Sequence, residues 1–206
     1  LLSEEGGSIS YKVRREWNKY WLIDPLDGTK EFIKRNGEFT VNIALIESGK
    51  PHAGFVYLPV KDILYWGTSM LGSFKVTNAS KADNEPELAK VKKLTGTRDD
   101  DKFRIVASRS HLSPETEKFI KNMCCKYKNT ELISAGSSLK LCMVAEGAAD
   151  VYPRFAPTME WDTAAADAVC RAAGCIVEEH PAGTPLKYNK ENLLNPWFIV
   201  KGKKYA

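Results

Sequence analysis

The stretch "YWLIDPLDGTKEF", residues 20–32, decides how the rest of the chain is interpreted. An apolar run typical of a β-strand ends at Asp24, and a second acidic residue, Asp27, follows three positions later. Two carboxylates this close repel each other, and one would become protonated unless a cation balances the charge. Hard divalent cations bind carboxylate and carbonyl oxygens, and the carbonyl of Leu26 stands between the two side chains. The stretch therefore predicts a metal site where a strand ends.

The residues that follow predict a phosphate site beside the metal. Gly28 allows the backbone to approach a ligand closely, and the residues from Lys30 onward favour a helical turn. The N–H groups of Gly28 and Thr29 would then point toward an anion, as they do at a helix N-terminus. An Asp-Gly pair is also common in ordinary tight turns. The stretch alone leaves both interpretations open.

Other acidic residues stand where they could join this site. Glu4 precedes the strand that carries Asp24, and Asp162 begins an alanine-rich helix directly after Trp161. Taken singly, Glu4 fits a solvated surface charge and Asp162 fits a helix N-cap. Together with the acidic turn they could supply the oxygen ligands of a divalent cation.

The composition is that of an ordinary globular protein of 206 residues, with 43% hydrophobic and 27% charged residues. A formal charge of +4 is spread along the chain, so no nucleic-acid-binding patch is indicated. No apolar run approaches the roughly 20 residues that cross a membrane, and no leader opens the chain. Five cysteines without metal-ligand spacing suggest reduced thiols. We expect a soluble protein that is not exported.

The hydrophobic pattern changes in the middle of the chain. Short β-rich runs alternate with turn pairs from Tyr20 to about Val76, which predicts an antiparallel meander, and the polar stretch 78–101 is the predicted junction. Strands then alternate with helices, which are expected at 113–128, 138–146 and 162–173, with Ser113 as an N-cap and Gly174 after the last helix. We expect an antiparallel-sheet lobe in residues 1–100 and an α/β lobe in residues 101–206, with the metal cluster between them.

The stretches "DPLDGT" and "EWDTAAADA" resemble the D-P-x-D-G-T and W-D-x-x-A motifs of the magnesium-dependent, lithium-sensitive inositol monophosphatase superfamily. The stretches "LSEE", "SRSH" and "GSSLK" are similar to its branch of 3'(2'),5'-bisphosphate nucleotidases, and the similarity covers essentially the whole chain. The resemblance implies an α+β fold, a layered αβαβα sandwich. Because the family's first helices precede its S-E-E strand, we expect that N-terminal helical layer to be missing here.

The resemblance also implies roles for particular residues. Two or three Mg²⁺ ions would be held by Glu4, Asp24, the carbonyl of Leu26, Asp27 and Asp162. Asp27, Gly28, Thr29 and Asp162 would hold the scissile phosphate, and Ser137, Lys140, Arg154 and His111 would line the nucleotide side. Catalysis would involve Glu4, Asp24 and Thr29, whose hydroxyl orients and deprotonates the attacking water. The aspartate that partners this threonine in the family lies in the preceding helices, so Thr29 has no partner in this sequence.

The implied activity is Mg²⁺-dependent hydrolysis of 3'-phosphoadenosine 5'-phosphate to AMP and phosphate by metal-activated water. Such chemistry needs no nucleophilic side chain, in agreement with a chain that has three histidines and no triad motif. Two alternatives stay open: a phosphatase for inositol or sugar monophosphates with the same metal site, and a module that binds Mg²⁺ and nucleotide without turnover. We expect a cytoplasmic protein, with peripheral association with the inner membrane as a further option. No oligomeric state is indicated.

Overall fold

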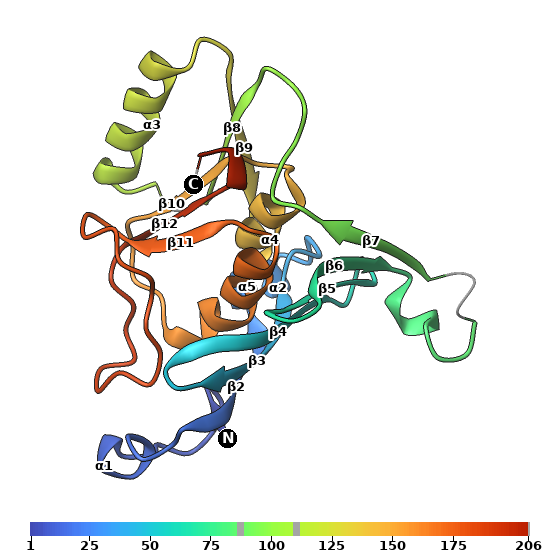
Figure 1. The fold of residues 1–206 in the computed structure, drawn as a ribbon, viewed down its shortest axis with the longest axis vertical. Coiled ribbons are helices and arrows are strands. Elements are labelled where there is room, and N and C mark those ends of the chain that lie inside the picture. Colours follow the sequence, from blue (N-terminus) through green and yellow to red (C-terminus); the bar gives the residue numbers. More distant parts are fainter. Residues whose placement is uncertain (86–88, 109–111, 206) are drawn as a thin grey trace.

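The structure is a computed structural model that describes residues 1–85, 89–108 and 112–205. These residues form four layers, which follow one another as sheet, helices, sheet and helix (Figure 1). The first sheet has seven strands and the second has five. Helices α4 (Leu139–Glu146) and α5 (Glu160–Ala172) lie between the sheets, and α3 (Pro114–Lys126) covers the outer face of the second. This arrangement confirms the expected layered α+β fold.

The first sheet is a meander whose strands follow their order in the sequence. Its strands are β1 (Leu2–Ser3), β2 (Lys19–Asp27), β3 (Thr40–Glu47), β4 (Lys50–Leu58), β5 (Ile63–Thr68), β6 (Gly72–Thr77) and β7 (Lys90–Leu94). Only the pair β1–β2 is parallel. Short helices α1 (Tyr11–Arg14), α2 (Thr29–Ile33) and η1 (Ala79–Lys81) lie in its connections.

Strand β7 corrects the expectation that residues 78–101 form only a junction. It pairs with β6 at the edge of the sheet and exposes Lys90, Val91, Lys92 and Lys93. Three lysines in five residues hide the alternation by which strands are identified. Lysines on an exposed edge also discourage pairing with another chain.

The second sheet has the strand order β11-β12-β10-β8-β9. Its strands are β8 (Phe103–Ser108), β9 (Thr130–Ala135), β10 (Val151–Arg154), β11 (Ile176–Glu179) and β12 (Phe198–Lys201), with η2 (Lys203–Tyr205) at the end of the described chain. The expected cap of α3 is confirmed, since the Ser113 hydroxyl accepts a hydrogen bond from the Thr116 N–H at 3.2 Å. Helix α5 begins at Glu160, two residues before its expected start.

The small residues of α5 let it lie directly on the first sheet. A Cβ atom added at Gly54 of β4 would lie 2.0 Å from the carbonyl oxygen of Ala165, and one added at Gly67 of β5 would lie 3.0 Å from the Cα of Val169. Position 54 requires glycine, because the backbone of α5 occupies the space that a side chain would fill. This close contact holds α5 directly against β4 and β5.

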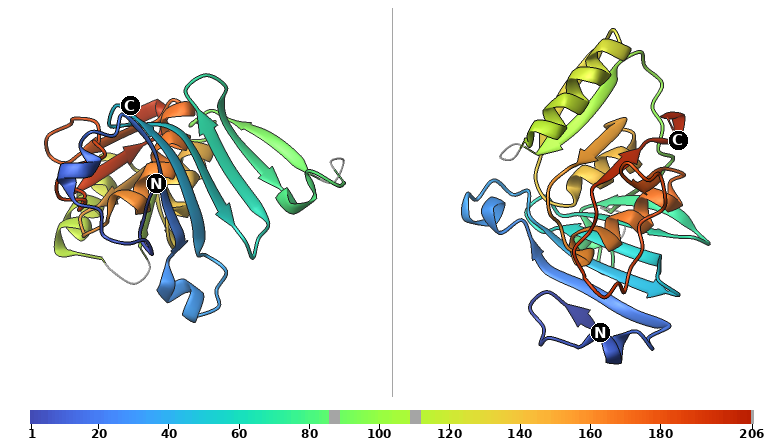
Figure 2. Two further views of the ribbon diagram at one scale, coloured as in Figure 1. Left: turned by 90° about the horizontal axis from the view of Figure 1, so that it is seen from below. Right: turned by 90° about the vertical axis from the view of Figure 1, so that its left-hand side faces the viewer.

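The opposite face of the first sheet remains open. Alternate residues of the strands, such as Val41, Ile43 and Phe55, are only half-buried there, and no helix of the described ranges packs across them (Figure 2). The four layers thus correspond to the expected sandwich without its first helical layer.

The largest hydrophobic cluster unites both halves of the chain, from Leu22 of β2 to Val144 of α4 and Phe198 of β12. The lobe boundary expected near residue 100 stays a prediction. None of the helices in the described parts of the chain is long and apolar enough to cross a membrane.

Candidate active site

Three carboxylates from distant parts of the sequence meet at one end of the first sheet. Strand β1 runs parallel to β2 with Ser3 opposite Ile23, so that Glu4 follows beside Asp24, and the Glu4 N–H donates to the Ile23 carbonyl at 3.2 Å. The first turn of α5 adds Asp162. One carboxylate oxygen of each acidic residue lies within 4.8 Å of the other two.

The negative charges of these carboxylates are close together and partly buried, so a bound cation would stabilise them. Asp24 is fully buried; its Oδ1 accepts a hydrogen bond from the Leu26 N–H at 2.9 Å, whereas its Oδ2 has no hydrogen-bond partner among the described residues. Burial, followed by the charge of Asp27, raises the pKa of Asp24 to about 8. Burial and the same neighbouring charge raise the pKa of Asp162 to about 7. An all-oxygen donor set with an unpaired buried oxygen suits a hard divalent cation.

A bulge in β2 turns the acidic stretch toward the site. Asp24 pairs with Asn42 and Asp27 pairs with Thr40, so two residues of β2 stand opposite the single residue Val41. A bulge of this kind changes the direction of the following side chains. The stretch around Pro25 therefore belongs to strand β2 and contains its bulge. The sequence did not indicate this bulge.

Asp27 lies next to the three carboxylates but outside their close group. Its Oδ2 accepts hydrogen bonds from the Ser138 N–H at 2.6 Å and from the Thr40 hydroxyl at 3.3 Å. These bonds fix the carboxylate between the first sheet and α4. Its role as a metal ligand, like that of the Leu26 carbonyl, stays a prediction.

Gly28 occupies a position that no other residue could take without rearrangement. Its φ of +88° is left-handed, and an added Cβ would lie 2.0 Å from the Oγ of Ser137. That hydroxyl donates to the Asp27 carbonyl at 3.0 Å. Thr29 begins α2 and is exposed, and its hydroxyl makes no hydrogen bond to any other residue that the structure describes.

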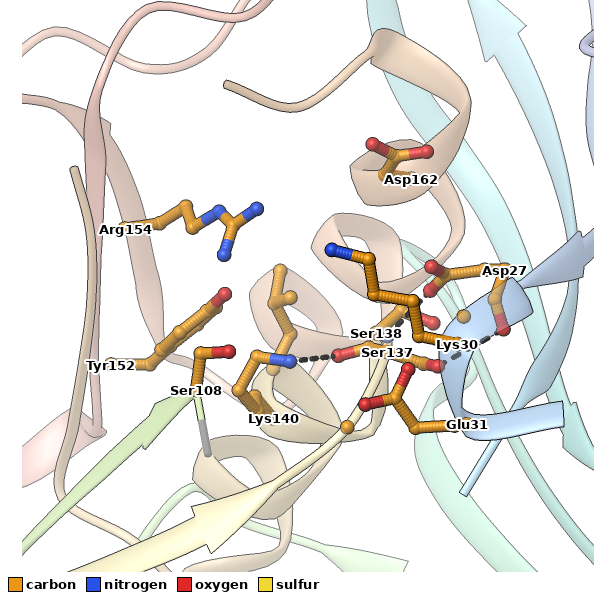
Figure 3. A pocket seen from close by; sticks show the side chains of 13 residues that line it. Asp27, Lys30, Glu31, Ser108, Ser137, Ser138, Lys140, Tyr152, Arg154 and Asp162 are labelled. Carbon is orange, nitrogen blue, oxygen red and sulfur yellow. Dashed lines mark hydrogen bonds between the residues drawn. The ribbon is translucent and has the colours of Figure 1, made fainter. Parts of the chain in front are cut away.

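Of the residues expected on the nucleotide side, Arg154 lies across the cavity from Asp27 and Asp162, whereas Ser137 lies beside Asp27 (Figure 3). Ser137, Lys140 and Arg154 line one cavity together with Asp27 and Asp162 (Figure 3). His111 lies outside the described residues.

Lys140 is a buried cation in the lining of this cavity. Its ammonium group donates to the Ser137 carbonyl at 2.7 Å and lies over the ring of Tyr152, 5.5 Å from the centroid. Burial lowers the pKa of Lys140 to about 8, although the charge of Asp27 opposes this shift. Arg154 donates to the Pro157 carbonyl at 3.0 Å. Its guanidinium adds a second positive charge to the cavity lining.

Several residues that the sequence analysis did not assign to the site line the same cavity. They are Lys30, Glu31, Ser108, Gly136, Ser138, Leu141 and Tyr152. Lys30 extends from α2 into the cavity (Figure 3). The sequence could have indicated Lys30 and Glu31, which continue the acidic stretch, and Ser138, which stands in "GSSLK". Tyr152 can be placed at the cavity only from the packing of strand β10.

Comparison with known proteins agrees with this fold. Residues 1–197 match the sequence model described as the inositol monophosphatase family. The chain belongs to the inositol monophosphatase family.

Among its relatives, the 3'(2'),5'-bisphosphate nucleotidase CysQ of Shigella flexneri is 47% identical over 201 residues, which are 97% of this chain and 74% of the relative. The protein of the same name from Escherichia coli K12 is 46% identical over the same shares. The crystal structure of CysQ from Bacteroides thetaiotaomicron is 53% identical and superposes with a TM-score of 0.88, covering 98% of this chain and 76% of that one. An inositol monophosphatase II from Staphylococcus aureus, 20% identical with a TM-score of 0.75 over 99% of this chain and 69% of its own, shares the fold.

Proposed function

We propose that this chain is a Mg²⁺-dependent phosphomonoesterase that hydrolyses 3'-phosphoadenosine 5'-phosphate to AMP and phosphate. One observation carries the proposal: a single cavity is lined by the carboxylates Asp27 and Asp162 and by the cations Lys140 and Arg154, and Lys30 extends into it beside Asp27. A nucleotide with two phosphates needs both features, one phosphate beside the metal site and the other near the cations. The nucleotidases named above support the same substrate class.

The proposed cofactor is Mg²⁺, with two or three ions held by the oxygens of Glu4, Asp24, Leu26, Asp27 and Asp162. The unpaired Oδ2 of Asp24 fits a ligand shared between ions, because no described protein group competes for it. When bound, such ions supply a water that deprotonates near neutral pH and positive charge for the phosphate and the leaving oxygen.

The chain's own residues would orient the reactants around this charge. Gly28 leaves room for the Ser137 hydroxyl, which holds the turn before α2 in place through the Asp27 carbonyl. The N–H groups of Gly28 and Thr29 would bind the scissile phosphate. The Thr29 hydroxyl, free of hydrogen bonds to other described residues, would orient the attacking water. Lys140 and Arg154 would bind the anionic part of the nucleotide.

A substrate panel tests the proposal. Phosphate release would be measured with 3'-phosphoadenosine 5'-phosphate, inositol 1-phosphate and a sugar phosphate, each with Mg²⁺, with Mg²⁺ plus Li⁺, and with a chelator. We expect the nucleotide to give the highest kcat/KM and Li⁺ to inhibit. Preference for inositol 1-phosphate would replace the proposed substrate, and nucleotide binding without turnover would indicate a binding module. A cytoplasmic location and peripheral membrane association stay predictions.

A further inference from the structure

The backbone of residues 189–191 joins two segments that carry carboxylates of the metal site. On one side it is held by Glu160, the first residue of α5, and on the other side by Arg14, the last residue of α1. We call these two side chains and the loop between them the 189–191 clamp. It lies behind the site and contributes no residue to the cavity wall.

Glu160 anchors the loop to α5. Its carboxylate is fully buried and accepts three hydrogen bonds: from the Asn189 N–H at 2.7 Å, the Lys190 N–H at 2.9 Å and the Lys190 ammonium group at 2.7 Å. A buried carboxylate is stable only with such compensation. Since Asp162 lies two residues further along the helix, the bonds of Glu160 also fix the first turn that carries it.

Arg14 anchors the same loop to the N-terminal segment. Arg14 is 3% exposed, and its guanidinium donates to the Asn189 side chain at 3.1 Å, the Lys190 carbonyl at 2.6 Å and the Glu191 carbonyl at 2.7 Å. The Asn189 side-chain amide donates back to the Arg14 carbonyl at 2.6 Å. This end of the clamp is therefore specific to a planar, forked donor, which lysine cannot replace.

The segment that carries Glu4 leads along the chain to Arg14, at the end of α1. Strand β1 lies at the edge of the sheet and is paired with β2 at Leu2 and Ser3, followed by the hydrogen bond from the Glu4 N–H to the Ile23 carbonyl. Glu4 nevertheless must stay close to two like-charged carboxylates, Asp24 and Asp162, which repel it when no cation is present.

We infer that Glu160 and Arg14 are positioning residues for the metal site, which hold Glu4 and Asp162 at ligand distance through the 189–191 loop. This inference rests on the proposed metal-dependent function. Residues that orient metal ligands without touching the ion commonly change affinity by about 10- to 100-fold. The clamp should therefore control how tightly ions bind and leave the chemistry of a fully loaded site unchanged.

The test measures Mn²⁺ binding to the folded protein from the electron paramagnetic resonance signal of free Mn²⁺. Glu160→Gln keeps the shape of the side chain but removes its charge. Arg14→Lys keeps the positive charge but removes the planar guanidinium group with its several donors. Each variant should weaken Mn²⁺ binding about tenfold, and the double variant should weaken it by less than the product, because both act through one loop. At saturating Mg²⁺, kcat should return to nearly the wild-type value.

Two controls separate positioning from general stability. Arg15→Lys alters the neighbouring arginine, whose ion pair with Glu16 is on the surface, and should leave Mn²⁺ affinity unchanged. Glu178→Gln breaks an ion pair with Lys201 in the second sheet and should lower only the unfolding temperature. Unchanged Mn²⁺ affinity in both clamp variants, with a lowered unfolding temperature, would overturn the inference. Absence of Mn²⁺ binding in the wild type would instead overturn the proposed function.

Discussion

The hydroxyl of Ser137 occupies the place where a side chain at Gly28 would begin, 2.0 Å from the position of the missing Cβ. Gly28→Ala should therefore destabilise the protein by more than the roughly 1–2 kcal/mol that a left-handed backbone costs an ordinary residue. It should also displace the turn next to the scissile phosphate and reduce kcat/KM strongly. Urea denaturation and phosphate release measure the two effects.

Ser137→Ala provides the matched control for this clash. In the Gly28→Ala background it removes the obstructing oxygen, so the double variant should be more stable than Gly28→Ala alone. If removing the Ser137 hydroxyl recovers no stability, the contact between the two residues is not the source of the cost.

Asp24→Asn should separate activity from folding. Loss of the carboxylate expected to be shared between ions should lower Mg²⁺-dependent turnover by at least about 100-fold. The metal-free protein should be equally stable or more stable near pH 8, because one of several repelling charges is gone. Phosphate release and thermal unfolding check both parts. Near-normal Mg²⁺-dependent activity in this variant would contradict the assignment of the metal site.

The pH dependence of stability should respond to metal. Burial and neighbouring carboxylates raise the pKa of Asp24 to about 8 and that of Asp162 to about 7, from ordinary values of 3.8. The metal-free folded chain thus keeps protons that the unfolded chain has lost, and its free energy of unfolding should fall as the pH rises from about 4 toward 8. Since Mg²⁺ replaces those protons, it should stabilise the protein more near pH 8 than near pH 5.

Urea denaturation at the two pH values, with and without Mg²⁺, measures this dependence. The double variant Asp24→Asn, Asp162→Asn is the control and should show a weaker fall with pH. Equal stabilisation by Mg²⁺ at both pH values would mean that the two carboxyl groups are not linked to metal binding.

Lys140→Met and Arg154→Gln should affect nucleotide binding more than the chemical step. A hydrogen bond to a charged group is worth roughly 1.5–3 kcal/mol, so each variant should raise KM for a bisphosphate nucleotide by about 10-fold or more. Loss of the buried charge of Lys140 should leave the fold intact, because its ammonium group satisfies a single carbonyl. Initial rates over a range of nucleotide concentrations give KM. An unchanged KM in both variants would direct the search to another substrate.

Much of the fold could be predicted from the sequence, because period-two alternation in runs such as residues 40–47 marks strands that are buried on one face. The cap at Ser113 and the glycine after α5 were equally readable. Strand β7 was missed because its lysines suit an exposed edge and erase the alternation.

Only part of the site could be predicted from the sequence, and the reason is physical. Its carboxylates stand in three recognisable stretches, "LSEE", "DPLDGT" and "EWDTAAADA", whereas the bulge that directs Asp27 depends on the register of β2 against β3. The bonds of Glu160 to Asn189 and of Arg14 to the same loop join residues far apart in sequence. Contacts of this kind leave no local pattern, and so the supporting residues appear only when the chain is folded.

The three closely grouped carboxylates lie on β1's edge, on β2 and on α5, at positions 4, 24 and 162. During synthesis the first two emerge from the ribosome long before the third, and the loop that braces them emerges later still. The three-carboxylate cluster therefore cannot form before Asp162 has been synthesised.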